Sequence, residues 1–530
     1  KEAAMSTPVV HDSSALSDGD LAPSPEPGEW RRQLIGLLAG IALAILIYFI
    51  FPSGAGDTVA ASPGAKEDVE YTSQAMRVVA ATTVLMGVWW MTEAIPLAAT
   101  ALLPIAIFPI MGVAKFKDVG APYASATIFL FMGGFLLALG LQRWNLHRRL
   151  ALYVVKIVGT SPRRLILGFM LATGFMSMWV SNTATAVVML PIGTSVLLLT
   201  ADTVGGMKNQ AKFATALMLA IAYAASIGSL GTLIGTPPNA LLKGYMEEAH
   251  DITIGFGRWM MVGMPVAIIF LFIAWWLLVT VFKPEIDEIP GGKELIDEEI
   301  RKLGPWTYPQ IMVGIIFVLA ALSWIFIPLG IERYGWGFPY DDAIVGIIAG
   351  LLMFTIPAAK DGKRLLDWET ANEMPWDVLL LFGGGLSLSA MFTSTGLSLW
   401  IGEAAKSLAT LPMFLLIVAI SALIIFLTEL TSNTATAATF LPIMGGVAVG
   451  IGLTGSTEMN VMLLCIPVAL AATCAFMLPV ATPPNAIAYS SGYVKMGDMI
   501  KGGIWLNLIG IVLISLATYF IAVPVFGLVL

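Results

Sequence analysis

A six-residue run that begins with Ser, Asn and Thr occurs twice, as SNTATA at 181–186 and again at 432–437. Both copies lie inside apolar sequence, where hydroxyls and amides are costly unless they find partners. Ser, Asn and Thr are favoured at helix N-caps, and a helix N-terminus offers free N–H donors and partial positive charge. The two runs therefore predict the two halves of one polar site for an anion.

The sequence around these runs carries no fixed positive charge. Lys and Arg are absent from 165–200, from 412–450 and from both copies of TPPNA, at 236–240 and 482–486. A helix terminus contributes on the order of 0.3–1 kcal/mol, too little to hold a dianion stripped of water. The double prolines must break a helix, and broken backbones offer the carbonyl oxygens that sodium needs. We therefore expect dissolved cations to bind together with the anion.

Composition places the chain in a membrane. Of 530 residues, 58% are hydrophobic and 12% charged, with mean hydropathy +0.85. Soluble proteins carry about 25% charged residues. The net charge of −7 provides no basic face for nucleic acid, so no nucleic-acid partner is expected.

The predicted fold is an all-α polytopic membrane protein with about eleven transmembrane helices and two re-entrant hairpins. Each hairpin has two apolar arms shorter than a full span, with SNT between them: 165–180 with 184–200, and 412–430 with 435–450. The expected spans are 34–52, 76–92, 95–112, 125–141, 213–230, 259–282, 307–329, 342–358, 377–393, 460–480 and 503–523.

Three motifs recur in the same order. SNTATA repeats at an offset of 251 residues and TPPNA at 246, and FMGG at 131–134 matches FGGG at 382–385. The chain is therefore an internal duplication. The glycine motifs lack the following lysine and the strand of a nucleotide loop, so they predict close helix packing.

The distribution of Lys and Arg sets the sense of the duplication. With the N-terminus inside, the predicted cytoplasmic segments hold 19 of these residues and the external ones eight. This bias follows the positive-inside rule, so the first hairpin opens inward, the second outward, and the repeat is inverted. The cytoplasmic segments are 31–32, 142–164 (an amphipathic surface helix), 201–212, 283–306, 360–375 and 490–502.

The repeat also divides the chain. We expect a disordered cytoplasmic tail at 1–33. The remaining segments are a first scaffold part at 34–164, a first transport half with the inward hairpin and a broken helix at 165–282, a charged cytoplasmic linker at 283–306, a second scaffold part at 307–411, and a second transport half with the outward hairpin and a broken helix at 412–530.

Paired SNT signatures in opposed hairpins, each followed by a TPPN break, resemble the divalent anion/sodium symporter family, as does TEAIP at 92–96. The resemblance covers about 34–525 and implies a multi-pass plasma- or inner-membrane protein. It further implies an elevator-type homodimer that carries C4 dicarboxylates, citrate or sulfate with Na⁺. The substrate contacts implied are Ser181, Asn182, Thr183, Ser432, Asn433, Thr434, Pro238 and Pro484. One sodium site is implied at Ser177, Ser181, Asn182 and the backbone near Gly235, and its partner at Thr428, Thr431, Asn433 and the backbone near Ala481.

The intact SNT in both halves favours a C4 dicarboxylate such as succinate, fumarate or malate. A dicarboxylate exchanger or a citrate or sulfate carrier of the same family remains an alternative, as does a proton-coupled carrier that uses Glu429. For Glu429 itself, a satisfied structural carboxylate is the favoured role, because the first copy has Met178 at that place. An enzyme is not expected, because no histidine lies inside a predicted span.

Overall fold

The computed structural model describes residues 27–62, 65–66, 69–159, 161–289, 291–337, 339–359 and 362–530. These residues form helices and no strand, so the all-α prediction is confirmed. Residues 27–33, expected in the N-terminal tail, are instead the first turns of a helix. The rest of that predicted tail, 1–26, lies outside the described residues.

The first half runs from α1 to α14. Its helices are α1 (Pro27–Ile50), α2 (Ala55–Ala60), α3 (Ser73–Thr92), α4 (Leu97–Thr100), α5 (Leu103–Ile110), α6 (Phe116–Gly120), α7 (Ala126–Arg143), α8 (Leu146–Val158), α9 (Pro162–Ser177), α10 (Asn182–Val204), α11 (Ala211–Ser229), α12 (Pro237–His250), α13 (Phe256–Val281) and α14 (Gly292–Lys302).

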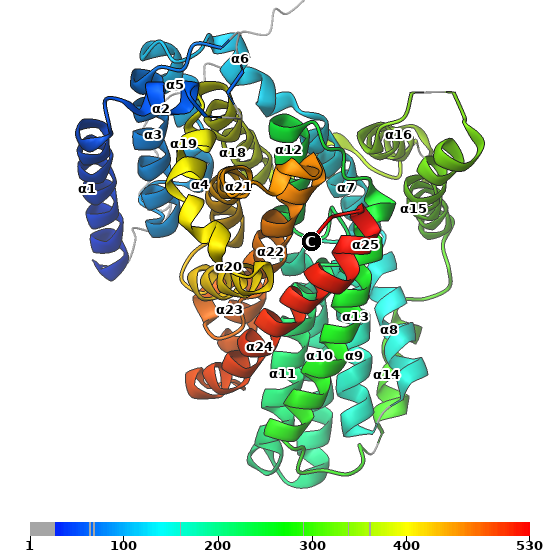
Figure 1. Cartoon of the computed structure of the whole chain (residues 1–530). Helices are drawn as coiled ribbons and strands as arrows, with labels where there is room; N and C mark the ends of the chain where they lie inside the picture. Colours follow the sequence, from blue (N-terminus) through cyan, green and yellow to red (C-terminus); the bar gives the residue numbers. More distant parts are fainter. Residues whose placement is uncertain are drawn as a thin grey trace, which may run out of the picture.

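The second half repeats the succession of a long helix, a surface helix, a hairpin and a broken helix. Its helices are α15 (Tyr308–Tyr334), α16 (Asp342–Thr355), α17 (Trp368–Ala371), α18 (Trp376–Thr395), α19 (Leu397–Ala404), α20 (Met413–Thr428), α21 (Asn433–Gly450), α22 (Met462–Ala472), α23 (Pro483–Ser490), α24 (Met496–Ala517) and α25 (Val523–Phe526). Helices α1 and α15 lie on opposite sides of the central bundle (Figure 1).

Among the described residues, nine helices are long and apolar enough to cross a membrane. Eight of the eleven expected spans are among them, whereas those expected at 95–112, 342–358 and 460–480 are shorter apolar helices. The ninth is the returning arm of the first hairpin, Asn182–Asp202, which is longer than its sequence suggested. The count of eleven spans therefore stays a prediction.

The broken helices end before their prolines. Helix α11 stops at Ser229 and α22 at Ala472, and the TPPN motifs open the next helices, α12 and α23. Proline is tolerated in the first turn because the N–H groups there lack helical partners anyway. The breaks therefore lie some residues earlier in the chain than the double prolines indicated.

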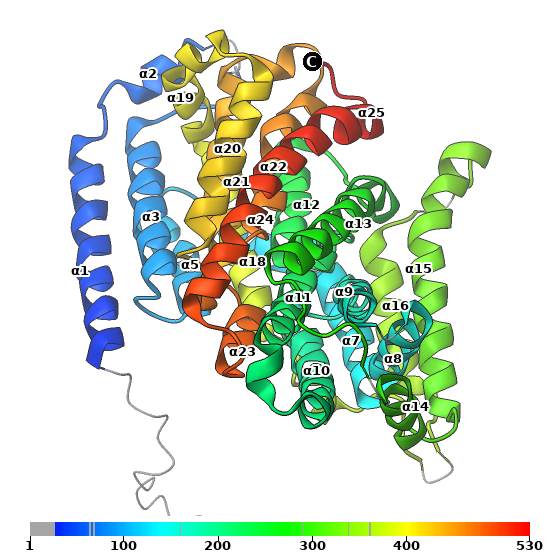
Figure 2. The ribbon, with the colours of Figure 1, turned by 90° about the horizontal axis from the view of Figure 1, so that it is seen from below.

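The ends of the helices fall on two sides of the molecule. In Figure 2 the start of α1, the end of α10, α14 and α23 lie at the lower end, whereas α2 and α19 lie at the upper end. Segments that the positive-inside rule assigns to the cytoplasm therefore share one side.

The charged linker 283–306 includes a helix and is hydrogen-bonded to the first scaffold part. It contains α14, which packs on the amphipathic α8. The buried Arg149 guanidinium of α8 donates to three carbonyl oxygens just after α14: Leu303 (3.0 Å), Gly304 (2.8 Å) and Pro305 (3.3 Å). It also stacks on Trp306, 5.0 Å from the ring centre.

Replacing Arg149 by methionine should loosen α14 without unfolding the protein. Hydrogen bonds to a charged group contribute about 1.5–3 kcal/mol, so cleavage within 283–306 by chymotrypsin should become roughly tenfold faster. Lys156→Gln is the matched control, because it breaks an exposed pair with Asp297 (2.7 Å) between the same two helices and should leave the rate nearly unchanged. Equal rates in Arg149→Met and the native protein would contradict this role.

The glycine motifs serve packing, as predicted. A Cβ added to Gly133 would lie 2.4 Å from the backbone of Gly346, and one added to Gly384 would lie 2.4 Å from the carbonyl oxygen of Ala101. Helix α7 therefore meets α16, and α18 meets the end of α4, at backbone contact.

Candidate functional site

The tip of the first hairpin is a tight turn between α9 and α10. Ser181 is the N-cap of α10, and its hydroxyl accepts a hydrogen bond from the Ala184 N–H (3.2 Å). Asn182 is the first helical residue, so its backbone donor lies at the helix N-terminus. Ser181 and Thr183 are exposed and Asn182 is half-buried. The predicted helix start at SNT is confirmed.

Behind this tip, three oxygen atoms converge. The Ser177 hydroxyl donates to the Asn182 side-chain oxygen (2.8 Å) and lies 2.5 Å from the carbonyl oxygen of Ala225 in α11. The close approach of α9 and α11 makes this possible, because a Cβ on Gly228 would lie 2.2 Å from the carbonyl oxygen of Gly174. A hydroxyl, an amide and a backbone carbonyl from three helices thus form a compact oxygen cluster.

The second hairpin builds the same cluster. The Thr428 hydroxyl lies 2.7 Å from the Asn433 side-chain oxygen and 2.8 Å from the carbonyl oxygen of Ala472. Ser432 is the N-cap of α21 but makes no side-chain capping bond. Ser432 and Asn433 are half-buried and Thr434 is buried, so this tip is more enclosed than the first.

The other predicted ligands have hydrogen bonds or packing contacts of their own. The Thr431 hydroxyl bonds to the Leu427 carbonyl (3.1 Å) and to the Thr436 hydroxyl (2.6 Å). Gly235 packs against the end of α11, with the Ser229 carbonyl oxygen 2.3 Å from where a Cβ would stand. Ala481 is buried in the turn before α23. Pro238 and Pro484 are buried at the second positions of α12 and α23.

The structure adds residues that the sequence reasoning missed. Ala225 and Ala472 supply carbonyls one repeat apart, and alanine gives no sequence signal for a backbone carbonyl that joins such a cluster. Asn239 donates its side-chain amide to the end of α11, with Thr232 O the nearest acceptor at 2.8 Å, and Asn485 donates to Ala475 O and Leu478 O, each at 3.1 Å. The repeated Asn of TPPN was the available signal.

The two halves of the site are interwoven. Helix α10 of the first hairpin packs on α23, and α12 packs on α21 of the second hairpin. The buried hydroxyls of Thr236 and Thr473 join the two breaks at 3.3 Å. The site is therefore built from both repeats.

Glu429, at the second tip, holds the second break in place. Its carboxylate is 3% exposed and accepts hydrogen bonds from the N–H groups of Phe476 (2.6 Å), Met477 (3.0 Å) and Leu478 (3.2 Å). The side-chain amide of Asn507 in α24 donates a further bond at 2.8 Å. The geometry agrees with the predicted role of a satisfied structural carboxylate.

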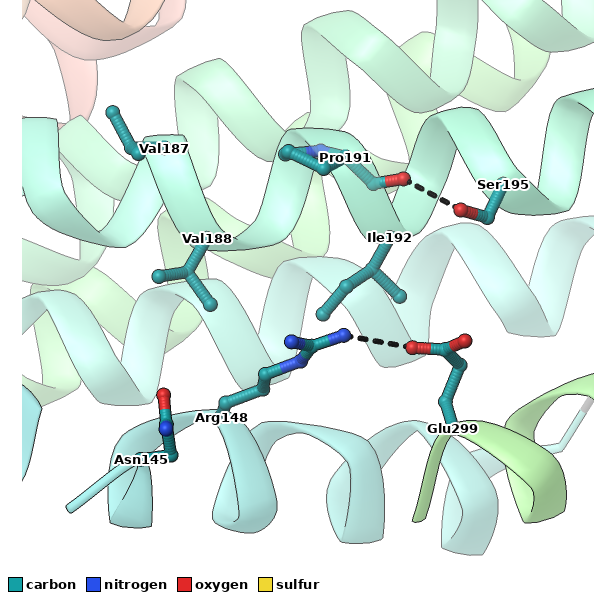
Figure 3. Close-up of a pocket in the computed structure, with 8 residues that line it drawn as sticks. All are labelled: Asn145, Arg148, Val187, Val188, Pro191, Ile192, Ser195 and Glu299. Carbon is teal, nitrogen blue, oxygen red and sulfur yellow. Dashed lines mark hydrogen bonds and ion pairs between the residues drawn. The ribbon is translucent and has the colours of Figure 1, made fainter. Parts of the chain in front are cut away.

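A cavity of about 240 Å³ lies beside the first hairpin rather than at its tip. Figure 3 shows it between α10, whose Val188 and Ile192 form an apolar wall, and an Arg148–Glu299 ion pair (2.8 Å) that joins α8 to α14. Of the residues that line it, Arg148 is the cation, and a carboxylate already neutralises it. The cavity therefore does not offer the positive potential that a dianion requires.

Comparison with known proteins shows the family of this chain. The sequence matches the family described as the sodium:sulfate symporter transmembrane region over residues 69–527. Two similar relatives, from Staphylococcus saprophyticus and Staphylococcus aureus (strain USA300), are each named sodium-dependent dicarboxylate transporter SdcS. They are 40% and 41% identical over 94% of this chain and 92% of their own length.

Two solved structures share the fold at low sequence identity. The YdaH transporter of Alcanivorax borkumensis has a TM-score of 0.52 at 13% identity, over 94% of this chain and 99% of its own. MtrF of Neisseria gonorrhoeae, described among antimetabolite efflux pumps, has 0.52 at 10%, over 93% and 98%. The similar proteins are transporters rather than enzymes. On the family match and the similarity to its relatives, the chain belongs to the sodium:sulfate symporter family of membrane transporters, as the paired motifs predicted.

Proposed function

We propose that this protein is a sodium-coupled symporter of C4 dicarboxylates such as succinate, fumarate and malate. The observation that carries the proposal is the pair of matching oxygen clusters, Ser177–Asn182–Ala225 and Thr428–Asn433–Ala472. Neutral hydroxyl, amide and carbonyl oxygens suit a hard cation such as Na⁺. The names of the SdcS relatives support the same substrate class.

The substrate binds, in this proposal, between the two tips. The SNT residues at 181–183 and 432–434 contact its carboxylates from the N-termini of α10 and α21, where partial positive charge favours an anion. Pro238 and Pro484 line the site from the breaks. Two sodium ions in the oxygen clusters supply the formal positive charge that the hairpins lack. Two sodium ions only neutralise a dianion, so the sodium gradient drives inward transport at this stoichiometry, and a negative membrane potential adds to it only when a further sodium ion accompanies the substrate.

We extend the proposal to the mechanism. The transport halves, 165–282 and 412–530, move as an elevator against scaffold parts 34–164 and 307–411 in a homodimer of the plasma or inner membrane. The N-terminus and the linker 283–306 are cytoplasmic. The opposite membrane orientation predicted for the two repeats supports alternating access of this kind.

Uptake of labelled succinate into proteoliposomes tests the function. We expect uptake to rise with an inward sodium gradient and to fall to background in potassium. Equal uptake in both media would refute sodium coupling. Uptake that needs preloaded dicarboxylate would instead identify an exchanger.

Sulfate and citrate are the competing substrates, because the family description names sulfate. A competition panel distinguishes them: excess unlabelled succinate, fumarate and malate should suppress uptake, and sulfate and citrate should not. Suppression by sulfate alone would reassign the substrate.

Ser177→Ala should weaken sodium binding specifically. The change removes the hydroxyl that links Asn182 to the Ala225 carbonyl, and loss of such an orienting partner costs about tenfold or more in metal affinity. The sodium concentration for half-maximal uptake should rise about tenfold. Ser177→Thr is the matched control, because the second cluster uses a threonine at the same place, and it should behave like the native protein. An unchanged sodium dependence in Ser177→Ala would remove this residue from the site.

A further inference from the structure

Lys243 is a cation buried where the first transport half meets the scaffold. The sequence placed it among external residues, yet its side chain is only 1% exposed. It pairs with Glu247, one turn further along α12. Glu247 in turn accepts a hydrogen bond from the Thr127 hydroxyl (3.2 Å) at the start of α7. A helix of the transport half is thus connected to a helix of the scaffold through buried charge.

Asp342 makes a second connection beside the first. It is the first residue of α16, is 4% exposed, and accepts a hydrogen bond from the N–H of Phe256 (2.9 Å), the first residue of α13. Its other oxygen accepts from the Tyr340 hydroxyl (2.7 Å). Scaffold helix α16 therefore caps transport helix α13.

We call Lys243, Glu247, Thr127, Asp342 and the Phe256 N–H the interdomain network. It is absent from the second repeat, where Tyr489 and Tyr493 occupy the positions that match Lys243 and Glu247 at the 246-residue offset of TPPNA. The network therefore does not belong to the duplicated machinery that contacts substrate and sodium. It occurs in the first repeat only, so it makes the two repeats differ.

The interdomain network and the exposed tip of the first hairpin lie at opposite ends of the transport half in the predicted topology. The network lies beside the connections 251–255 and 335–341, which the predicted topology places outside. At the first hairpin, which opens inward in that topology, Ser181 and Thr183 are exposed, whereas Thr434 of the second hairpin is buried. The network thus joins the halves at the outer end while the inner end is accessible.

We infer that the interdomain network is a latch that holds the transport half in the inward-open arrangement. The inference rests on the elevator motion in the proposed function. When the transport half slides, the Lys243–Glu247 pair moves with α12, whereas Glu247 loses the Thr127 hydroxyl of α7 and Asp342 of α16 loses the Phe256 N–H. A largely buried carboxylate that loses a hydrogen-bond donor is more costly than an exposed ion pair that separates. Such a network favours two discrete positions over a continuous range.

Distance measurements between spin labels on the two parts test the latch without substrate. Thr253, between α12 and α13, and Lys117 of α6 are both exposed, and Cys465 and Cys474 are fully buried, so labels at introduced cysteines should report alone. In nanodiscs, the parent double-cysteine protein should show one dominant distance. Asp342→Asn and Lys243→Met should each raise the fraction at a second distance about tenfold or more.

Arg258→Gln is the matched control. It breaks an exposed pair with Glu332 (3.0 Å) that also joins α13 to the scaffold, and it should leave the distribution unchanged. If Asp342→Asn does not yield folded protein, Thr127→Val carries the same test, because it removes the hydrogen bond from α7 of the scaffold to Glu247 of α12.

An unchanged distance distribution in folded latch variants would overturn the latch, as would an equal shift in Arg258→Gln. Because the measurement needs neither sodium nor succinate, its outcome is independent of the uptake assay. Failure of sodium-driven uptake by the native protein would overturn the proposed function. The spin-label distances would still decide whether the latch exists.

Discussion

Asn182→Ala and Asn433→Ala should each abolish sodium-driven succinate uptake, with a loss of about 100-fold or more. Each amide oxygen accepts the hydroxyl of its cluster, Ser177 at 2.8 Å or Thr428 at 2.7 Å, and each stands at the N-terminus where the substrate is proposed to bind. In the proposed function, one substitution therefore removes a contact to the anion and an oxygen from the cluster that would hold sodium. Coupled binding of the two solutes would then make the effects multiply.

The measurement is initial uptake into proteoliposomes at matched protein content. Both variants should elute and melt like the native protein, because alanine is a good helix former and each Asn is only half-buried. Ser195→Ala, further along α10 with a local bond to the Pro191 carbonyl (3.0 Å), should transport normally. Native uptake in either Asn variant would refute the site assignment.

Glu429→Ala should strongly destabilise the protein. The change leaves three buried backbone donors, at Phe476, Met477 and Leu478, and the Asn507 amide without an acceptor. Each unsatisfied group costs about 1–3 kcal/mol, so the total loss of folding free energy is of the order of 4 kcal/mol or more. The melting temperature in detergent should fall by roughly 4 °C or more.

Glu429→Gln separates structure from proton coupling. Glutamine keeps one oxygen acceptor, so the melting temperature should fall by only roughly half as much as in Glu429→Ala. If Glu429 carried a coupling proton, the Gln variant would lose any pH-driven uptake while sodium-driven uptake survived. We expect instead that uptake stays sodium-driven in Gln, scaled by the amount of folded protein. Normal melting in Glu429→Ala would contradict the structural role.

The hairpins and the duplication could be predicted because each depends on local chemistry. SNT is a strong capping sequence in an apolar setting, and the structure starts α10 and α21 at those residues. The structural role of Glu429 could be predicted because the first copy of the SNT region has Met178 at the matching place. These features depend on residue type and spacing, which a sequence states directly.

Other features depend on contacts distant in sequence. The Ala225 and Ala472 carbonyls are backbone groups of residues whose side chains carry no polar atom. Only the packing of α9 on α11 and of α20 on α22 identifies them as part of the clusters. Lys243 counts among the external Lys and Arg residues in the predicted topology, and its burial depends on the packing of α12 against α7, α18, α21 and α22, which the sequence does not state. The linker helix α14 was missed because its partner, Arg149, lies on a different element.

The packing of α10 on α23, and of α12 on α21, has a consequence for biosynthesis. The amino-terminal repeat is synthesised before α23, so α10 of the first hairpin at first lacks the helix on which it packs in the complete protein. A nascent chain stalled ahead of Met462 should therefore reach the membrane with α10 lacking the packing surface that α23 provides. The first repeat can complete its packing only after the carboxy-terminal repeat has inserted.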